Sequence, residues 1–349
     1  MSIRVPSLVI PRYGGADVFE IEEIELPVPG AGEVFVRVAA AGVNFAEVFC
    51  RLGLYKHAPP PPFVPGFEFA GTVEAVGDGV ALAIGTPVLG VVRFGGYQGG
   101  IVIDARRVRP IPAGWTMAEA AAFPAAALTA AYGLLEPGNL RQGETIVVHS
   151  AAGGVGSMAV QLAKALGAQV VGTVGSDHKL QVLEELGCDV ALNYKEGNWA
   201  AAVKESVGSV DVVFDALGGR YLRDGYDLLG RRGRLISYGL GTMTPRGNRP
   251  NPFRLFWQYL QIPRFSVFPL ISDNKLVAGF NVLLLWDDLA ILGELMNRCM
   301  TFAEQGKMRP RVSQVVPYDR VADVHRALQS GTTTGKMVLS FSSSTGNEC

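Results

Sequence analysis

Residues 145–156 read TIVVHSAAGGVG, and this stretch decides the fold. The apolar run 145–149 predicts a buried β-strand, and the glycines after it mark a sharp turn into a helix over 154–166. The turn matches the dinucleotide-binding fingerprint G-x-G-x-x-G with alanine in the first place, and a backbone without side chains can approach a pyrophosphate at the helix N-terminus. A strand-to-helix turn that holds no ligand is the alternative. The predicted contacts of the turn are Ala151, Gly153, Gly154, Val155 and Gly156.

On the C-terminal side of this turn, apolar runs alternate with helical stretches up to residue 238. The runs are almost continuously apolar, which is typical of parallel strands whose two faces are both covered by helices. The pattern predicts an α/β fold with a doubly wound parallel sheet of the Rossmann type. The predicted strands are 145–149, 169–174, 189–193, 210–215 and 234–238, and the predicted helices between them are 154–166, 177–186, 197–207 and 220–229.

On the N-terminal side, residues 1–115 contain short β-like runs separated by Gly and Pro, which predicts a β-rich, partly barrel-like unit. Those runs are 34–39, 71–76, 86–92 and 101–103. After about residue 285, a helical stretch (287–305) and a short apolar run (336–341) look like a return to this first unit. We therefore predict a split β-rich domain, 1–125 and 286–349, with a Rossmann domain, 126–285, inserted into it.

Composition excludes several classes of protein. With 31 basic and 32 acidic residues the formal net charge is −1, so there is no sequence-wide electrostatic footprint for nucleic acid. The four cysteines lie far apart, which excludes an all-cysteine zinc cage and a disulfide framework and favours reduced thiols in a cytoplasmic protein. The N-terminal apolar run is broken by a proline and an arginine, so no secretory signal is expected. The alanine-rich run 120–135 favours a buried helix over a transmembrane span.

The second predicted strand of the Rossmann pattern bears on the choice of dinucleotide. A site that prefers NAD usually has an acidic residue at the tip of this strand, on the ribose 2′-hydroxyl, but residues 172–176 read GTVGS. Asp177 comes later, where it serves equally well as an acidic residue at a helix start. Lys179 is near enough to meet a 2′-phosphate, so we expect NADPH, and a solvated helix lysine is the alternative for Lys179.

The sequence resembles the quinone oxidoreductase branch of the medium-chain dehydrogenase/reductase superfamily, the zeta-crystallin-like proteins, over nearly its whole length. The matching motifs are 42–44, 51–55, 65–68, 151–156, 193–194 and 335–336. Within that branch, 217–219, 225–226 and 273–281 look most like the vesicle amine transport protein relatives. The resemblance implies a GroES-like catalytic domain, a Rossmann domain that binds NADPH, and a homodimer.

The resemblance also implies site residues. In the family, residues that match Ser176, Lys179 and Tyr194 hold the adenosine phosphate end of NADPH. Residues that match Asn44, Tyr55 and Thr129 line the nicotinamide and substrate cleft. We add Gly239 and Asn281 as predicted cofactor contacts. Asn44 and Tyr55 are the candidates for polarising an acceptor oxygen; a turn asparagine and an ordinary loop tyrosine are the alternatives.

Two positions depart from the zinc-dependent relatives, which have a cysteine where this chain has Asn44 and a histidine where it has Phe67. Neither side chain replaces those ligands, and Glu68 alone cannot hold a catalytic zinc, so we expect no metal. The favoured activity is hydride delivery from NADPH to a quinone or an α,β-unsaturated carbonyl, which needs only a hydrogen bond to the oxygen where charge develops. A catalytically weak NADPH-binding protein that acts through a partner or a lipid surface is the second hypothesis, and a zinc alcohol dehydrogenase is the third.

Residues 244–257 form an unusual insertion, in which Arg246, Arg249 and Arg254 stand beside Phe and Trp. The segment is compatible with peripheral contact to an anionic membrane, with a lid over the acceptor cleft, or with a packed dimer element. The strand-like run 280–285 after it is predicted to be a sheet edge that pairs between two subunits.

Overall fold

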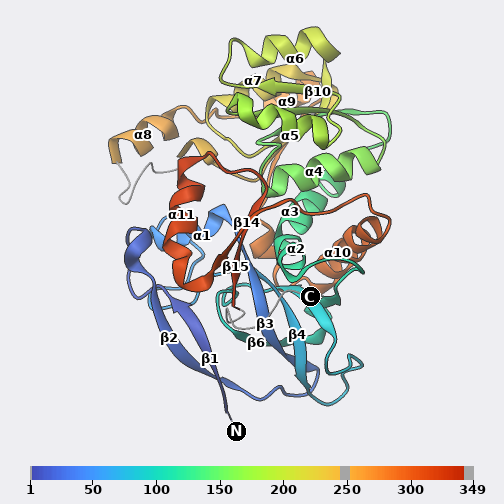
Figure 1. Ribbon diagram of the computed structural model, residues 1–349. Helices are drawn as coiled ribbons and strands as arrows, with labels where there is room; N and C mark the ends of the chain where they lie inside the picture. The colour runs from blue at the N-terminus through green and yellow to red at the C-terminus, as the bar shows by residue number, and fades with distance from the viewer. Residues whose placement is uncertain (1, 244–251, 342–349) are drawn as a thin grey trace.

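The computed structural model describes residues 2–243 and 252–341, and its strands form three sheets (Figure 1). A six-stranded sheet with its helices makes up the upper part of the view in Figure 1. A seven-stranded sheet, built from the first and last parts of the chain, makes up the lower part. A two-stranded antiparallel sheet, β1 (Ser2–Val9) with β2 (Glu20–Pro27), lies beside it.

The six-stranded sheet is parallel throughout and has the order β10-β9-β8-β11-β12-β13. Numbered along the chain this is 3-2-1-4-5-6, the doubly wound Rossmann order, which confirms the predicted fold class. Sheets of this kind bind ligands beyond the carboxyl ends of the strands at which the order reverses, which here are β8 and β11. The strands are β8 (Thr145–His149), β9 (Gln169–Val174), β10 (Val190–Asn193), β11 (Val210–Asp215), β12 (Leu229–Ser237) and β13 (Leu276–Gly279).

Both faces of this sheet are buried, which explains why its strands are apolar without alternation. On β8, Ile146 and Val148 pack into one core, with α3, α4 and α10, whereas Val147 packs into a second core, with α6 and α7. The helices are α3 (Pro124–Leu135), α4 (Gly154–Ala165), α5 (Leu180–Glu185), α6 (Trp199–Val207), α7 (Arg220–Leu228) and α10 (Leu289–Glu304).

The seven-stranded sheet has the order β14-β15-β3-β4-β5-β7, and its remaining strand, β6, pairs with β3. The two C-terminal strands, red in Figure 1, therefore join the blue N-terminal strands, as the predicted return of the chain requires. The exact boundaries at 125/126 and 285/286 stay a prediction. The strands are β3 (Glu33–Val43), β4 (Glu68–Val76), β5 (Pro87–Val91), β6 (Gly100–Asp104), β7 (Val108–Pro110), β14 (Val312–Pro317) and β15 (Lys336–Ser340).

The predicted strand at 280–285 is wrong. The edge strand is β13, and Val282–Leu285 forms the 3-10 helix η5. The Asn281 side chain accepts the Leu283 N–H at 3.1 Å and starts this helix. The Phe280 ring leaves the sheet and packs 5.1 Å from the ring of Tyr132. The sheet edge therefore ends at Gly279.

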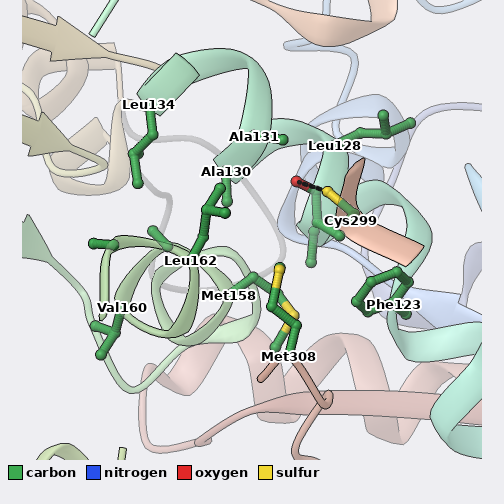
Figure 2. Close-up of a cluster of buried hydrophobic side chains, with 14 of the residues drawn as sticks. Phe123, Leu128, Ala130, Ala131, Leu134, Met158, Val160, Leu162, Cys299 and Met308 are labelled. Carbon is green, nitrogen blue, oxygen red and sulfur yellow. Dashed lines mark hydrogen bonds between the residues drawn. The ribbon is translucent and has the colours of Figure 1, made fainter. Parts of the chain in front are cut away.

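The alanine-rich segment is a core element. It forms α2 (Met117–Ala122) and α3, and the segment Met117–Leu135 is long and apolar enough to cross a membrane, but 67% of its most apolar window is buried inside the protein. Figure 2 shows Leu128, Ala130, Ala131 and Leu134 of α3 beside Met158 and Leu162 of α4 and Cys299 of α10. The alanine side chains allow the two helices to approach closely, and the prediction of a buried helix is confirmed.

Candidate active site

The glycine turn between β8 and α4 lies at the carboxyl edge of the parallel sheet. A Cβ atom on Gly156 would lie 2.2 Å from the Ser150 carbonyl oxygen, so a side chain at this position does not fit. Gly153 is the N-cap of α4, with no side chain to cap it. The first-turn N–H groups of a helix have no partner within the helix, and they carry the positive end of its dipole. All five predicted residues of the turn lie here, and the geometry fits a pyrophosphate.

A second polar position lies at the ends of β9 and β10. A Cβ atom on Gly175 would lie 2.6 Å from the Tyr194 hydroxyl oxygen and 3.3 Å from Cε of Lys195. Ser176 is the N-cap of the 3-10 helix η3 (Asp177–Lys179), which carries Lys179. Burial lowers the pKa of Lys179, and the nearby charge of Lys195 lowers it further. The ammonium groups of Lys179 and Lys195 are therefore close enough to interact, which favours an anion between them.

Sequence reasoning missed Lys195, although it directly follows the Asn193-Tyr194 motif. Two acidic side chains lie nearby: Asp177 accepts a hydrogen bond from Asn193 Nδ2 at 2.8 Å, and its contact with Glu196 raises the pKa of Glu196. Lys179 Nζ itself donates to the Gly331 carbonyl oxygen at 2.7 Å, from the loop before β15. That loop therefore lies against the predicted phosphate position.

The start of β15 is joined to the glycine turn. The Gly335 N–H donates to the Ala152 carbonyl oxygen at 2.7 Å, and Gly335 forms a bridge with Gly153. The aliphatic stem of Lys336 passes over Gly154, where a Cβ atom would lie 2.5 Å from Lys336 Cδ. The two parts of the fold thus meet at the predicted pyrophosphate position.

Beneath this junction, four buried or half-buried polar residues form what we call the Lys336 corner: Asn44, Glu47, Glu68 and Lys336. Lys336 Nζ donates to Glu68 Oε1 at 2.5 Å, to Asn44 Oδ1 at 2.7 Å and to the Val43 carbonyl oxygen at 2.9 Å. Asn44 Nδ2 donates to Glu68 Oε1 at 2.9 Å and to Glu47 Oε1 at 3.3 Å. The amide of Asn44 is therefore engaged at both ends.

Glu47 is the unusual acid of this corner. It is the third residue of α1 (Phe45–Arg51), and its carboxylate accepts the backbone N–H of the N-cap Asn44, so the two form a capping box. Burial raises the pKa of Glu47 to about 8, the nearby charge of Lys336 opposes this shift and that of Glu68 adds to it. At neutral pH Glu47 therefore holds a proton. The sequence N-F-A-E at 44–47 is the signal that could have identified it.

The other predicted cleft residues lie around this corner. Thr129 Oγ1 donates to the Ala125 carbonyl oxygen at 2.7 Å, and the Ala125 N–H donates to Glu68 Oε2 at 2.8 Å, so α3 carries both contacts. The Tyr55 ring packs against Phe67, with 6.5 Å between ring centroids. Asn281 Nδ2 donates to the Tyr55 hydroxyl oxygen at 2.8 Å. This contact joins the two parts of the fold, and the roles of these residues toward a ligand stay predictions.

Gly239 lies where the chain leaves β12. A Cβ atom on Gly239 would lie 2.8 Å from the Ala216 carbonyl oxygen, which follows β11. The position is at the carboxyl edge of the sheet and requires a glycine for close backbone approach. Its predicted contact with a cofactor stays a prediction.

The described residues do not fit a catalytic zinc. No group of three or more His, Cys, Asp or Glu side chains among residues 2–243 and 252–341 could hold a metal ion. Both oxygens of Glu68 already accept hydrogen bonds from protein groups. His149 and His325 are fully buried, and burial lowers the pKa of each to about 3, with the charge of Arg51 adding to the shift at His325. They are neutral core residues.

A doubly wound sheet with a glycine turn, joined to a GroES-like β-domain, defines a two-domain dinucleotide-binding fold. Residues 154–296 match the zinc-binding dehydrogenase family, and residues 30–129 match the alcohol dehydrogenase GroES-like domain. The chain belongs to the medium-chain dehydrogenase/reductase superfamily, as the resemblance predicts.

Three similar proteins illustrate the range within this superfamily. The synaptic vesicle membrane protein VAT-1 homolog of Rattus norvegicus is 33% identical over 338 residues, which cover 95% of this chain and 83% of that protein. The quinone oxidoreductase of Escherichia coli, complexed with NADPH, has a TM-score of 0.82 at 28% identity and covers 96% of this chain and 99% of its own. The CurK enoyl reductase has a TM-score of 0.83 at 28% identity, with the same coverage of both chains.

The raised pKa of Glu47 predicts the pH dependence of stability. The ordinary value of 4.5 applies to the unfolded chain and a value of about 8 to the folded protein, so the stabilising effect of the bound proton is present below about pH 4.5 and is lost as the pH rises through about 8. Glu47→Gln keeps the capping contact but cannot ionise. We expect the melting temperature of the wild-type protein to fall by a few degrees more than that of the variant between about pH 5 and about pH 9, as measured by scanning calorimetry.

The matched control is Glu119→Gln in the second capping box, at the start of α2. Partial burial would raise the pKa of Glu119, but hydrogen bonds from Arg309 and Thr116 outweigh it, and its pKa is lowered. This control should keep the alkaline loss of stability. An identical pH profile for the wild type and Glu47→Gln would contradict the assignment.

Proposed function

We propose that the protein is an NADPH-dependent oxidoreductase that transfers a hydride to a quinone or an α,β-unsaturated carbonyl without a metal. The observation that carries the proposal is the junction at Gly154 and Lys336. There the stem of Lys336 lies over the glycine turn proposed for the pyrophosphate, and its ammonium group donates to Asn44, so one side chain links the turn to Asn44. NADPH supplies the hydride when it is bound, and the protein residues bind and orient the reactants.

The proposed cofactor contacts divide into two groups. The turn at 151–156 binds the pyrophosphate through backbone N–H groups at the start of α4, and glycine at 156 lets the turn pack closely against the Ser150 carbonyl oxygen. Ser176, Lys179, Tyr194 and the additional Lys195 surround the position proposed for the 2′-phosphate. A phosphate there exchanges the Lys179 contact with the Gly331 carbonyl for a charge-assisted contact. The NADPH complex of the similar quinone oxidoreductase supports this cofactor.

The acceptor is proposed to lie near Asn44 and Tyr55. Of the hydrogen bonds that Asn44 makes, the one from Nδ2 to Glu47 Oε1 is the longest, at 3.3 Å, and a protonated carboxyl group is a weaker acceptor than a carboxylate. This N–H is therefore the one that can turn to an acceptor oxygen at least cost. The half-buried Tyr55 and Phe94 pack against the buried Phe67, and this aromatic group suits a planar quinone.

The Lys336 corner supports the proposal that no metal takes part. Glu68 is the acidic residue that follows Phe67, the position at which the zinc-dependent relatives have a histidine ligand. Its two oxygens accept hydrogen bonds from Lys336, Asn44 and the Ala125 N–H. The positive charge beside Glu68 is thus that of the Lys336 ammonium group. We propose that polarisation of the acceptor comes from hydrogen bonds alone.

Turnover tests the proposal directly. The purified protein should oxidise NADPH faster than NADH with 9,10-phenanthrenequinone or an enal, and prior treatment with EDTA should leave the rate unchanged. The measurement is the loss of NADPH absorbance. Binding of NADPH without turnover on any of about a dozen acceptors of these two classes would reject the oxidoreductase proposal.

Cofactor preference depends on Lys179. Lys179→Ala should weaken NADPH binding roughly 10-fold or more and change NADH binding little, because only NADPH carries the 2′-phosphate and a charge-assisted hydrogen bond contributes about 1.5–3 kcal/mol. Isothermal titration with both cofactors measures the ratio. Lys204→Ala, on the exposed surface of α6, is the control and should leave the ratio unchanged. Equal losses for both cofactors in Lys179→Ala would show that Lys179 does not bind the phosphate.

The second candidate function, binding to a lipid surface, is favoured by α8 (Pro252–Leu260), which projects from the side of the molecule in Figure 1. Its exposed apolar side chains are Phe253, Phe256, Trp257, Tyr259 and Leu260. Trp and Tyr are typical of membrane interfaces. Arg246 and Arg249, predicted to contact anionic lipid, lie outside the described residues, as does the side chain of Arg254.

Co-sedimentation with vesicles tests this function. The wild-type protein should bind vesicles that contain anionic phosphatidylserine, and a Phe256→Ser, Trp257→Ser variant should lose at least half of the bound fraction, because two interfacial aromatic side chains are removed. Tyr13→Ser, at an exposed tyrosine outside α8, is the control. Unchanged binding after removal of the charges of Arg246 and Arg249 would exclude the version that depends on the basic insertion.

We also propose that the chain forms a homodimer through β13. This strand is the last in the six-stranded order, and no other strand of residues 2–243 and 252–341 pairs with its outer edge, so a second copy could pair there. The adjoining helix α9 (Val267–Asp273) exposes Val267, Phe268 and Ile271, which a partner subunit would cover.

A further inference from the structure

The ammonium group of Lys336 is fully coordinated by protein oxygens. An ammonium has three N–H groups, and Lys336 Nζ has three acceptors: Glu68 Oε1, Asn44 Oδ1 and the Val43 carbonyl oxygen, at 2.5–2.9 Å. Only 5% of the Lys336 side chain is exposed, and Glu68 is fully buried. A lysine held in this way gives up its hydration and its rotamer freedom, so its function is to fix the groups around it.

We propose that Lys336 is a positioning residue for hydride transfer, one that orients the Asn44 amide and ties it to the cofactor turn. The inference rests on the proposed function, in which Asn44 polarises the acceptor. An ammonium accepts no hydrogen bond, so it can face only the oxygen end of an amide. Lys336 therefore holds Oδ1 of Asn44 and directs its Nδ2 away, toward Glu68 and Glu47.

The charges around the ammonium support this role. Glu68 from β4, Glu47 and Asn44 from α1, and Lys336 from β15 meet at one point, with the Tyr97 ring buried near the two carboxyl groups. With Glu47 protonated, Lys336 and Glu68 balance each other, and Asn44 lies between opposite charges that both favour one orientation of its amide dipole. Loss of the ammonium removes the contact that holds Oδ1 and leaves only the Glu68 contact of Nδ2 to favour that orientation.

The stem of Lys336 provides the link to the cofactor turn. Its Cδ lies over Gly154, the first residue of α4, and the residue before it is bonded to Ala152. A shift of the turn therefore moves the ammonium and, with it, Asn44.

A double-mutant cycle tests the inference in the full-length protein. Lys336→Met keeps the length of the side chain and removes its charge. Single-turnover hydride transfer from bound NADPH to 9,10-phenanthrenequinone should slow by at least about 10-fold in Lys336→Met and in Asn44→Ala, whereas the double variant should be at most about 3-fold slower than either, because both changes remove the same oriented amide. The dissociation constant for NADPH should change by less than about 3-fold, which distinguishes positioning from phosphate binding.

If Lys336→Met does not fold, the same cycle is measured in the Glu68→Gln background, where loss of the ammonium leaves no unpaired buried charge. Lys164→Met is the control, because Lys164 pairs with Asp189 at the surface at a similar distance of 2.9 Å and should not affect the rate. Two results would overturn the inference without affecting the proposed function. One is a rate for the double variant that equals the product of the two single losses, and the other is a large loss of NADPH affinity in Lys336→Met. Absence of hydride transfer in the wild-type protein overturns the proposed function and this inference together.

Discussion

The buried ion pair between Lys336 and Glu68 is the interaction on which the arrangement of the site depends. Removing one partner of such a pair leaves a charge in a low-dielectric environment and typically costs about 3–5 kcal/mol. Lys336 begins β15 and Glu68 begins β4, so the pair joins the C-terminal part of the chain to the N-terminal sheet. Since Asn44 bonds both partners, neither strand can shift without the start of α1.

The absence of a side chain at Gly154 meets two structural requirements, one of the cofactor turn and one of Lys336. The turn before α4 needs a backbone free of side chains if a pyrophosphate is to approach it. The same missing side chain leaves the space through which Lys336 reaches Glu68, because a Cβ atom on Gly154 would lie 2.5 Å from Lys336 Cδ. A substitution here would therefore disturb the cofactor turn and the Lys336 corner together. The two parts of the site are physically coupled at one residue.

The sequence predicts the parallel sheet well because burial on both faces leaves a local signal. The predicted strands 145–149, 169–174 and 210–215 coincide with β8, β9 and β11. The predicted start of β12 at 234 is late, because residues 230–233 bulge from the ladder, with Leu229 opposite Val210 and Arg234 opposite Val212. The prediction for 280–285 fails because a continuous apolar run does not distinguish a strand from the 3-10 helix that the Asn281 side chain starts.

The parts of the candidate site that are built from neighbouring residues could be predicted from the sequence, whereas the parts built from distant residues could not. The glycine turn is contiguous in sequence, so its residues could be predicted together, whereas Lys336 and Glu68 are 268 positions apart and no pattern pairs them. The sequence shows that Asn44 and Phe67 are not zinc ligands, but it does not show which groups surround Glu68 and Asn44 instead. A chain that loses those ligands and keeps a buried glutamate must neutralise it by another cation or by a proton. Lys336 meets that requirement for Glu68, and a proton meets it for Glu47. The charges and hydrogen bonds of the whole Lys336 corner therefore set the surroundings of Asn44, and the two missing ligands alone do not define them.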